Sequence, residues 1–292
     1  MKKGALFLNI VFDSAQESLE VVQYLQQVQA LSKRSELRTF TIKQDENRIQ
    51  IEGPALGGRK YLVQQGLYSW IWEKKRIQWC HHWLEHHYYF TDEEERSHIL
   101  HILWEFTDAK SHVRSLVEGP DEEQLLREAL ESELIEDEYL HFRSFVTFRL
   151  RKFQVKLREV VELAIDEYKL EQDYQMFVES LRNFLRGRSP VVEMIHLVQD
   201  EGCFLFFDGS GRWIKQGELY KSVDRKLIVN HPAYIDSVTI APLLSIAPRR
   251  IRMYTDAPDE GIARTICTIF DERVEVYPRQ KAGSLLESKR SV

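Results

Sequence analysis

The chain has 292 residues, of which 43% are hydrophobic and 29% are charged. This composition is typical of a soluble globular protein and excludes a disordered, collagen-like or membrane-embedded chain. Forty Lys and Arg against 46 Asp and Glu give a formal charge of −6, which indicates no global affinity for nucleic acid or anionic membranes. The three cysteines, Cys80, Cys203 and Cys267, cannot form a disulfide framework, so we expect a reducing cytoplasm. No apolar stretch reaches the roughly 18 residues of a transmembrane helix, so we expect no membrane insertion.

Residues 1–58 predict a small β-α-β-β unit. The apolar run 5–12 lacks an Ala-x-Ala cleavage site, which favours a strand over a secretory signal. Hydrophobic residues at helical spacing then predict a helix over Ser14–Ser32. Two alternating segments, Leu37–Ile42 and Arg48–Ile51, predict a hairpin.

Residues 59–188 predict an almost entirely helical middle region. The segment Thr91–Glu94 has the S/T-x-x-E pattern of a capping box, which predicts a helix start. The longest helical pattern runs from Phe142 to Leu185, and its polar stretch Lys169–Asp173 predicts one interruption. Gly187 follows as the predicted C-terminal stop.

The segment Glu118–Glu138 is strongly acidic, with ten acidic residues and one basic residue, Arg127. A narrow apolar stripe predicts a helix that is packed on one side and solvated on its acidic side. The stripe consists of Leu125, Leu126, Leu130 and Leu134. We interpret the acidic side as a docking face for a protein partner.

Residues 189–279 predict a C-terminal α/β unit. Val191–Val198 and Cys203–Phe207 predict a β-hairpin. A β-α-β unit is predicted to follow, over Arg250–Tyr254, Glu260–Phe270 and Val274–Tyr277. Residues 280–292 are polar and predict a flexible tail. The whole pattern predicts an α+β fold in which small β-containing units at both ends are joined by a mostly helical middle.

Histidines give the sharpest catalytic hypothesis. Seven of the ten fall between His81 and His112, and residues 82–86 spell His-x-x-Glu-His, the motif of inverted zincin peptidases. On a helix His82 and His86 lie one turn apart, so both imidazoles can hold one zinc ion while Glu85 activates a water. The further candidate metal ligands are His98 and His101. A histidine-rich window raises the chance of such a match, so we favour surface or helix-packing histidines and predict no cofactor.

Two basic groups raise the alternative of nucleic-acid binding. An acidic helix next in sequence to a basic one is also typical of antiparallel neighbours with complementary faces, and we favour that interpretation. The groups are Arg149, Lys152 and Lys156, which share a helix face, and Arg249, Arg250 and Arg252, at the start of a strand.

Short segments along most of the chain match the core and charged positions of a known family. They are Tyr89–Glu94, Phe148–Leu150, Asp166–Tyr168, Phe177, Leu181-Arg182, Phe184, Ile195-His196 and Ile246–Ile251. In this order they resemble the YtxC-like sporulation protein family of spore-forming Firmicutes. The resemblance implies a cytoplasmic bacterial protein linked to sporulation, and its motifs include no catalytic signature.

The residues and the resemblance together predict a sporulation-associated cytoplasmic protein that is non-enzymatic and acts through protein contacts. Its docking face is predicted within Glu118–Glu138, and no catalytic residue is assigned. One alternative is a nucleic-acid-binding accessory protein that uses the two basic groups. The other is a zinc-dependent hydrolase centred on His82, Glu85 and His86.

Overall fold

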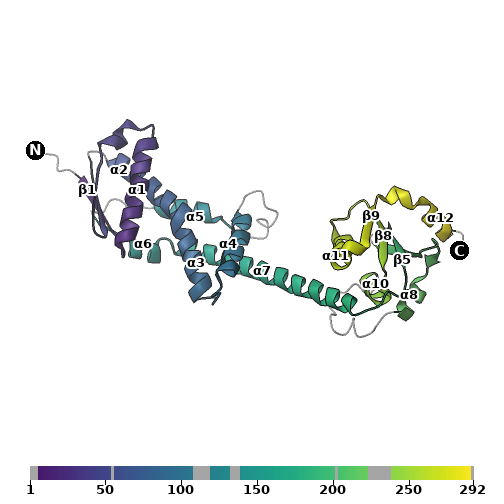
Figure 1. Ribbon diagram of the computed structural model, residues 1–292. Coiled ribbons are helices and arrows are strands. Elements are labelled where there is room, and N and C mark those ends of the chain that lie inside the picture. The colour runs from purple at the N-terminus through teal and green to yellow at the C-terminus, as the bar shows by residue number, and fades with distance from the viewer. Residues whose placement is uncertain are drawn as a thin grey trace, which may run out of the picture. The chain divides into compact units, whose positions relative to one another are not determined.

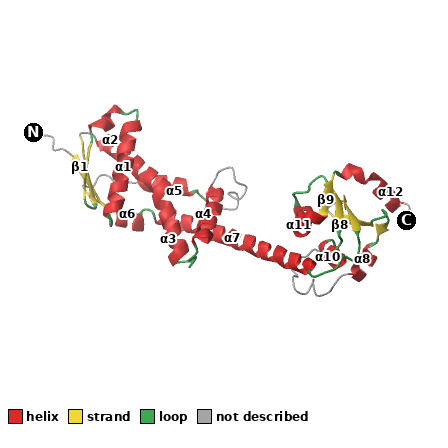
Figure 2. Cartoon of the chain, viewed as in Figure 1, coloured by secondary structure: helices red, strands yellow, loops and turns green. Residues whose placement is uncertain are grey.

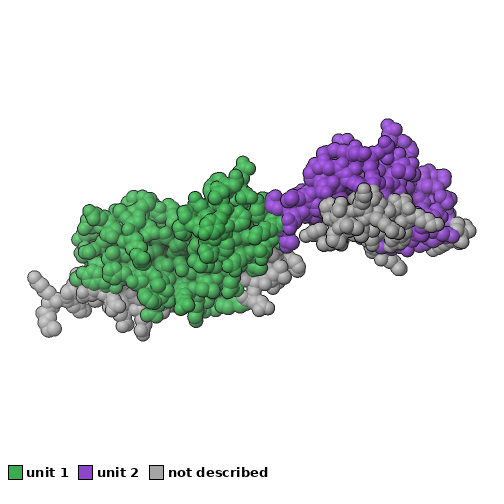
Figure 3. All heavy atoms as spheres, turned by 90° about the horizontal axis from the view of Figure 1, so that it is seen from below, with its two compact units in different colours: residues 1–169 green, residues 170–292 purple. Residues whose placement is uncertain are grey.

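A computed structural model describes residues 6–53, 56–107, 119–131, 139–200, 203–222 and 238–290. The chain divides into two compact units, residues 1–169 and 170–292 (Figure 3). The boundary falls within the long helix α7, Arg151–Arg186. Each unit has a small sheet, and helices fill the sequence between the two sheets (Figure 2), so the predicted α+β class is confirmed. The finer division at residues 58, 188 and 279 stays a prediction.

The sheet of the first unit has the strand order β2-β3-β1-β4. Strand β3 is antiparallel to both β1 and β2, whereas β4 pairs parallel to β1. The strands are β1 (Leu6–Val11), β2 (Thr41–Asp45), β3 (Arg48–Gly53) and β4 (Tyr139–His141). The three-residue β4 was not predicted.

One face of this sheet is buried. Leu8 pairs with Ile51 and Ile10 with Ile49, and all four side chains are inaccessible to solvent. Helices α1 (Ala15–Leu31) and α2 (Leu56–Trp70) pack on this face (Figure 1). The period-2 alternation of apolar residues in β1 and β3 therefore encodes which side meets the helices.

The first predicted hairpin strand begins later than expected. Residues Ser35–Thr39 form a 3-10 turn, and β2 starts only at Thr41. The side-chain amide of Gln29 donates to the carbonyl oxygens of Leu37 and Phe40, both at 2.9 Å. These local bonds satisfy backbone groups without a neighbouring strand, and they hold Leu37 in the core.

The helical region of the first unit begins with a continuous helical path. It runs through α2, a π-helical turn (Ile71–Lys75) and α3 (Arg76–His86). Helix α4 starts as predicted, but its capping residue is Asp92, whose Oδ1 accepts from the amides of Glu94 and Glu95 at 2.8 and 3.0 Å. The remaining helices are α4 (Glu93–Thr107), α5 (Glu122–Glu131) and α6 (Phe142–Phe148).

Helix α7 is uninterrupted, so the break predicted at Lys169–Asp173 is wrong. All five of these residues are exposed, and most are good helix formers, so their polarity does not end the helix. The actual break precedes α7, where the amides of Arg149 and Leu150 both donate to the carbonyl of Phe145. The helix ends at Arg186, directly before Gly187, as predicted.

The sheet of the second unit has the strand order β7-β6-β5-β8-β9. Strands β5 and β6 form the predicted hairpin, and β8, α11 and β9 form the predicted β-α-β unit with β8 and β9 parallel. The strands are β5 (Met194–Asp200), β6 (Cys203–Asp208), β7 (Trp213–Ile214), β8 (Arg250–Tyr254) and β9 (Val274–Tyr277). The helices are α8 (Gln216–Ser222), α10 (Ile240–Ile246), α11 (Gly261–Phe270) and α12 (Gly283–Arg290).

Both faces of this second sheet are covered in part. The main core joins one face to α10, α11 and the end of α7. On the other face a smaller cluster contains Phe207 and Tyr254, with Leu285 and Leu286 of α12 packed against it. In the predicted flexible tail, residues 280–292, the residues that the structure describes belong to a 3-10 turn (Arg279–Ala282) and to helix α12.

Candidate functional site

The outer side of α5 forms an acidic face around a hollow of about 400 Å³. Four of the residues that line the hollow are spaced three or four positions apart, so they lie on one side of the helix. The hollow is lined by Asp121, Glu123, Gln124, Arg127, Glu128 and Glu131, which we call the acidic face. It contains four carboxylates and one guanidinium. Glu118 and residues 132–138 of the predicted acidic segment lie outside the described residues.

The inner side of α5 is packed, as its apolar stripe predicted. Leu126 and Leu130 are buried and Leu125 is partly buried. Glu122 is only 2% exposed and therefore does not belong to the acidic face. Leu134 lies outside the described residues.

The start of α5 is capped by a member of the acidic face. Oδ1 of Asp121 accepts from the backbone N–H of Gln124 at 2.6 Å. Gly119, with a φ of 87°, precedes this cap in a backbone conformation that glycine adopts without strain. The sequence Gly-Pro-Asp thus sets where α5 begins.

A column of two guanidinium and three aromatic groups anchors α5 to four other helical segments. Cζ of Arg127 lies 4.1 Å from the ring centre of Tyr68, and the rings of Tyr68 and Trp72 stack with centroids 6.3 Å apart. Cζ of Arg76 lies 3.7 Å from the ring of Trp72 and 4.7 Å from the ring of Trp104. Each cation–π contact contributes about 0.5–1 kcal/mol or more once desolvated. The column holds the acidic face in a fixed position.

Hydrogen bonds to Glu123 reinforce this anchor. Its Oε1 accepts from the hydroxyl of Tyr68 at 2.7 Å and from Nε and Nη2 of Arg127 at 3.0 and 2.6 Å. The bonds from Tyr68 and Arg127 lower the pKa of Glu123. Burial and the bond to Glu123 raise the pKa of Tyr68 to about 12. Glu123 is thus charged at neutral pH and bound internally. The exposed Glu131 and the exposed Glu128, which among the described residues accepts only a bond from the side-chain amide of Gln124 at 2.8 Å, are better placed for a partner.

Arg76 lies between the two tryptophans of the column. Its Nε and Nη1 are buried and have no hydrogen-bond partner in the part of the chain that the structure describes. Burial lowers the pKa of Arg76, and the nearby carboxylate of Glu122 opposes that shift. Burial also raises the pKa of the adjacent Cys80 thiol to about 12, so this thiol is not activated as a nucleophile.

The column was not predicted as a unit. Its first three members occur at intervals of four residues, 68, 72 and 76, which is the signal that places them on one helix side. Trp104 and Arg127 come from helices that are distant in sequence, and no local pattern pairs them with Trp72 or Tyr68.

The His-x-x-Glu-His motif lies on helix α3, as the zinc hypothesis requires. The rings of His82 and His86 stack with centroids 4.4 Å apart. Oε2 of Glu85 lies 3.7 Å from Nδ1 of His86, and both side chains are more than half exposed. The three candidates therefore lie together on an open surface.

The two other candidate ligands, on α4, have different neighbours. His98 meets the ring of Tyr168 edge-on with centroids 5.4 Å apart, and Nδ1 of His101 lies 3.7 Å from Oε1 of Glu105. Within the described ranges, no group of three or more His, Cys, Asp or Glu side chains is placed to hold a metal ion.

The first basic group does not form one exposed surface. Arg149 and Lys152 are exposed, whereas Lys156 is buried and its Nζ lies 3.0 Å from Oε2 of Glu159. The charge of Lys156 is therefore compensated on its own helix.

The second basic group lies in the other unit, opposite carboxylates. Arg249 and Arg250 lie 3.7 and 3.8 Å from Glu193, and Nε of Arg252 lies 3.3 Å from Glu275. These exposed pairs reduce the local positive charge that a phosphate backbone would meet.

Known proteins resemble most of this sequence. The profile of the YtxC-like family matches residues 61–275, a range that includes the column, the acidic face and α7. The uncharacterized protein YtxC of Bacillus subtilis (strain 168) is 36% identical over 206 residues, which cover 67% of this chain and 69% of that protein. No solved structure matches the chain. Among the helices that the structure describes, none combines the length and the apolar character needed to span a bilayer. The predicted resemblance is confirmed, and the chain belongs to the YtxC-like family.

Proposed function

We propose that this chain is a sporulation-associated cytoplasmic protein that acts without catalysis, by docking a basic segment of a protein partner on the acidic face of α5. The link to sporulation is what the resemblance to the YtxC-like family implies, and the profile of that family matches residues 61–275. All three cysteines are free, which supports a reducing compartment.

The single observation that carries the proposal is the composition of the acidic face. Four carboxylates and one guanidinium surround a hollow of about 400 Å³ on one side of a helix. Complementary charge steers association and disfavours partners of the wrong sign. An amphipathic helix with Lys or Arg at three- and four-residue steps matches the spacing of Gln124, Glu128 and Glu131.

The anchoring of α5 supports the same proposal. The column and the bonds to Glu123 fix the helix before a partner arrives. A surface that is already ordered loses less conformational entropy on binding, which favours affinity.

The two alternatives have weaker structural support. Lys156 and the second basic group lie opposite carboxylates, which lowers the attraction for nucleic acid. Two stacked imidazoles and one carboxylate on an open surface lack the shielding that zinc sites use to activate water.

A charge-reversal experiment tests the docking face. The binding of a synthetic lysine-rich amphipathic helix to the full chain is measured by isothermal titration calorimetry at low and physiological salt. The double variant Glu128→Lys/Glu131→Lys is expected to bind about tenfold more weakly, a loss of about 1.4 kcal/mol. The matched control Glu105→Lys/Glu167→Lys reverses two exposed carboxylates elsewhere in the first unit and is expected to bind within about twofold of the parent. Equal losses in both variants would contradict a specific face.

The cellular role is tested separately. In a spore-forming host whose own gene is replaced, the yield of heat-resistant spores is counted for the parent chain and both double variants. The proposal predicts a reduced yield for Glu128→Lys/Glu131→Lys alone, at equal protein levels. A normal yield from a strain that lacks the gene would refute the sporulation link and leave the binding result standing.

A further inference from the structure

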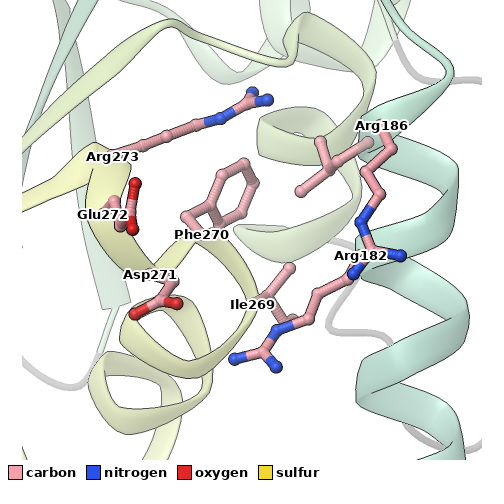
Figure 4. Close-up of a pocket in the computed structure, with 8 residues that line it drawn as sticks. Arg182, Arg186, Ile269, Phe270, Asp271, Glu272 and Arg273 are labelled. Carbon is pink, nitrogen blue, oxygen red and sulfur yellow. The ribbon is translucent and has the colours of Figure 1, made fainter.

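The second unit contains a hollow of about 250 Å³ where the end of α7 meets the end of α11. Residues 182, 185 and 186 of α7 form one wall, and residues 269 and 270 of α11 form the floor. The 3-10 turn Asp271–Arg273 forms the opposite wall (Figure 4). Three of the lining side chains are arginines, Arg182, Arg186 and Arg273.

Two of these guanidinium groups are oriented by uncharged acceptors. Nε and Nη2 of Arg182 donate to the carbonyl oxygen of Thr268 at 3.1 and 2.7 Å, and Nη1 of Arg273 donates to the carbonyl of Pro248 at 3.3 Å. Carbonyl groups fix the direction of a guanidinium but do not cancel its full charge. Each guanidinium has five N–H donors, so both keep donors for a ligand after these bonds are made.

Arg186 is held by two side chains of its own helix. Its Nη1 lies 3.3 Å from Oε1 of Glu179 and 2.7 Å from Oδ1 of Asn183. The side chains of Arg186 and Glu179 are 67% and 51% exposed, and an exposed pair of this kind contributes little. Replacing the ion pair with Glu179 by a contact between Arg186 and a ligand therefore costs little free energy.

Two carboxylates, Asp271 and Glu272, also line the hollow. Among the described residues, no ion pair joins Asp271 or Glu272 to Arg182, Arg186 or Arg273. Figure 4 shows both carboxylates on the turn that lies across the hollow from the two arginines of α7. The α7 wall of the hollow is thus positively charged.

The backbone at the base of the hollow is strained. Asp271 has a φ of 44° and a ψ of −113°, a conformation that residues other than glycine rarely adopt. This residue ends α11 and leads directly to Arg273 on the facing wall. Strain that persists in a folded protein often accompanies a functional site.

We propose that this hollow binds a small anion through a phosphoryl group. Guanidinium groups bind phosphate with paired hydrogen bonds, and a phosphoryl group offers them three or four oxygens. A flat carboxylate offers only two. The volume of about 250 Å³ also leaves room for atoms beyond the phosphoryl group itself. The hollow belongs to the second unit, so this proposal is independent of the acidic face on α5.

Calorimetric titration of the full chain with inorganic phosphate and with pyrophosphate tests the site, with acetate as the carboxylate control. The double variant Arg186→Gln/Arg273→Gln is expected to lower the affinity for phosphate about tenfold or more. Arg182 is left in place because it caps the end of α11. The matched control Arg264→Gln, an exposed arginine of α11 outside the hollow, is expected to stay within about twofold.

The results separate the sources of the anion. Phosphate binding that pyrophosphate does not exceed indicates a free-phosphate site, and tighter binding of pyrophosphate indicates a larger phosphorylated ligand, so both support the proposal. No heat of binding at about 10 mM of either probe overturns it. Equal binding of acetate, or an equal loss in Arg264→Gln, also overturns it. The unfolding midpoints of the variants, measured by circular dichroism, show whether each remains folded.

Discussion

The hydroxyl of Tyr68 on α2 donates a 2.7 Å hydrogen bond to the carboxylate of Glu123 on α5. This bond joins residues 55 positions apart and ties the acidic face to the helical core of the first unit. Through this bond the carboxylate helps to raise the pKa of Tyr68, and the phenol helps to lower the pKa of Glu123.

The phenol of Tyr68 should titrate late. Burial and the bond to Glu123 raise its pKa from 10.0 to about 12. The neutral phenol therefore stabilises the folded chain below pH 10, and this contribution is lost as the pH rises towards 12. Phenolate absorbance during alkaline titration should show one fewer late-ionising tyrosine in Tyr68→Phe than in the parent. Tyr139→Phe, at an exposed position, is the control and should leave the late step unchanged.

Two glycines of α2 should respond oppositely to alanine. A Cβ at Gly66 would lie 2.5 Å from Cδ2 of Leu25 on α1, so Gly66→Ala is expected to destabilise the chain by about 1–3 kcal/mol through overpacking. A Cβ at Gly57 would meet no atom within 4 Å, so Gly57→Ala is expected to stabilise α2 by about 0.5–1 kcal/mol. Urea unfolding monitored by circular dichroism measures both. A stabilising Gly66→Ala would show that α1 and α2 do not pack this closely.

Asp208 should contribute to stability down to acidic pH. Burial alone would raise the pKa of Asp208, but hydrogen bonds from Ser210 and Arg212 outweigh it and lower the pKa to about 2. The ionised carboxylate therefore stabilises the turn above pH 3.8, and this contribution is lost as the pH falls towards 2. Asp208→Asn is expected to lower the unfolding free energy by about 1–2 kcal/mol at pH 7, by the loss of bonds to a charged acceptor. The difference from the parent should stay constant from pH 7 to 4, and a difference that fades near pH 6 would contradict the assignment.

Metal chelation should leave the stability of the chain unchanged. His82, Glu85 and His86 lie on an open helix surface, where two imidazoles and one carboxylate bind zinc weakly. Thermal unfolding of protein purified without an affinity tag should give the same midpoint with and without EDTA. A midpoint that falls with EDTA and is restored by zinc, but not in His82→Ala, would revive the zinc hypothesis.

Sequence patterns predicted the elements whose signals are local. Strands Arg250–Tyr254 and Val274–Tyr277 were predicted at their observed limits because each is a short, clearly bounded alternating run. Strand β4 has three residues and exists through its pairing with β1, so no local pattern reveals it. Helix α12 contributes only Leu285 and Leu286 to the cluster around Phe207 and Tyr254. Two leucines do not form a hydrophobic pattern from which a packed helix can be predicted.

The candidate site also has one part that local sequence predicts and another that depends on contacts between distant residues. The concentration of charge in Glu118–Glu138 predicted an acidic helix side, and Glu128 and Glu131 lie on it. The column could not be predicted because its contacts cross five helical segments, from Tyr68 to Arg127. Burial of Glu122 likewise depends on which side of α5 meets the core, and charge counts alone do not distinguish it from Glu128.

The distribution of indole rings gives this protein a built-in optical reporter. Five of its six tryptophans lie in the first unit, and Trp213 is in the second. Trp213 packs in the cluster that receives Leu285 and Leu286, and Nζ of Lys289 lies 5.9 Å from its ring. The difference between the emission spectra of the parent and Trp213→Phe therefore gives the fluorescence of Trp213 alone. This signal reports when α12 separates from the cluster, without any added dye.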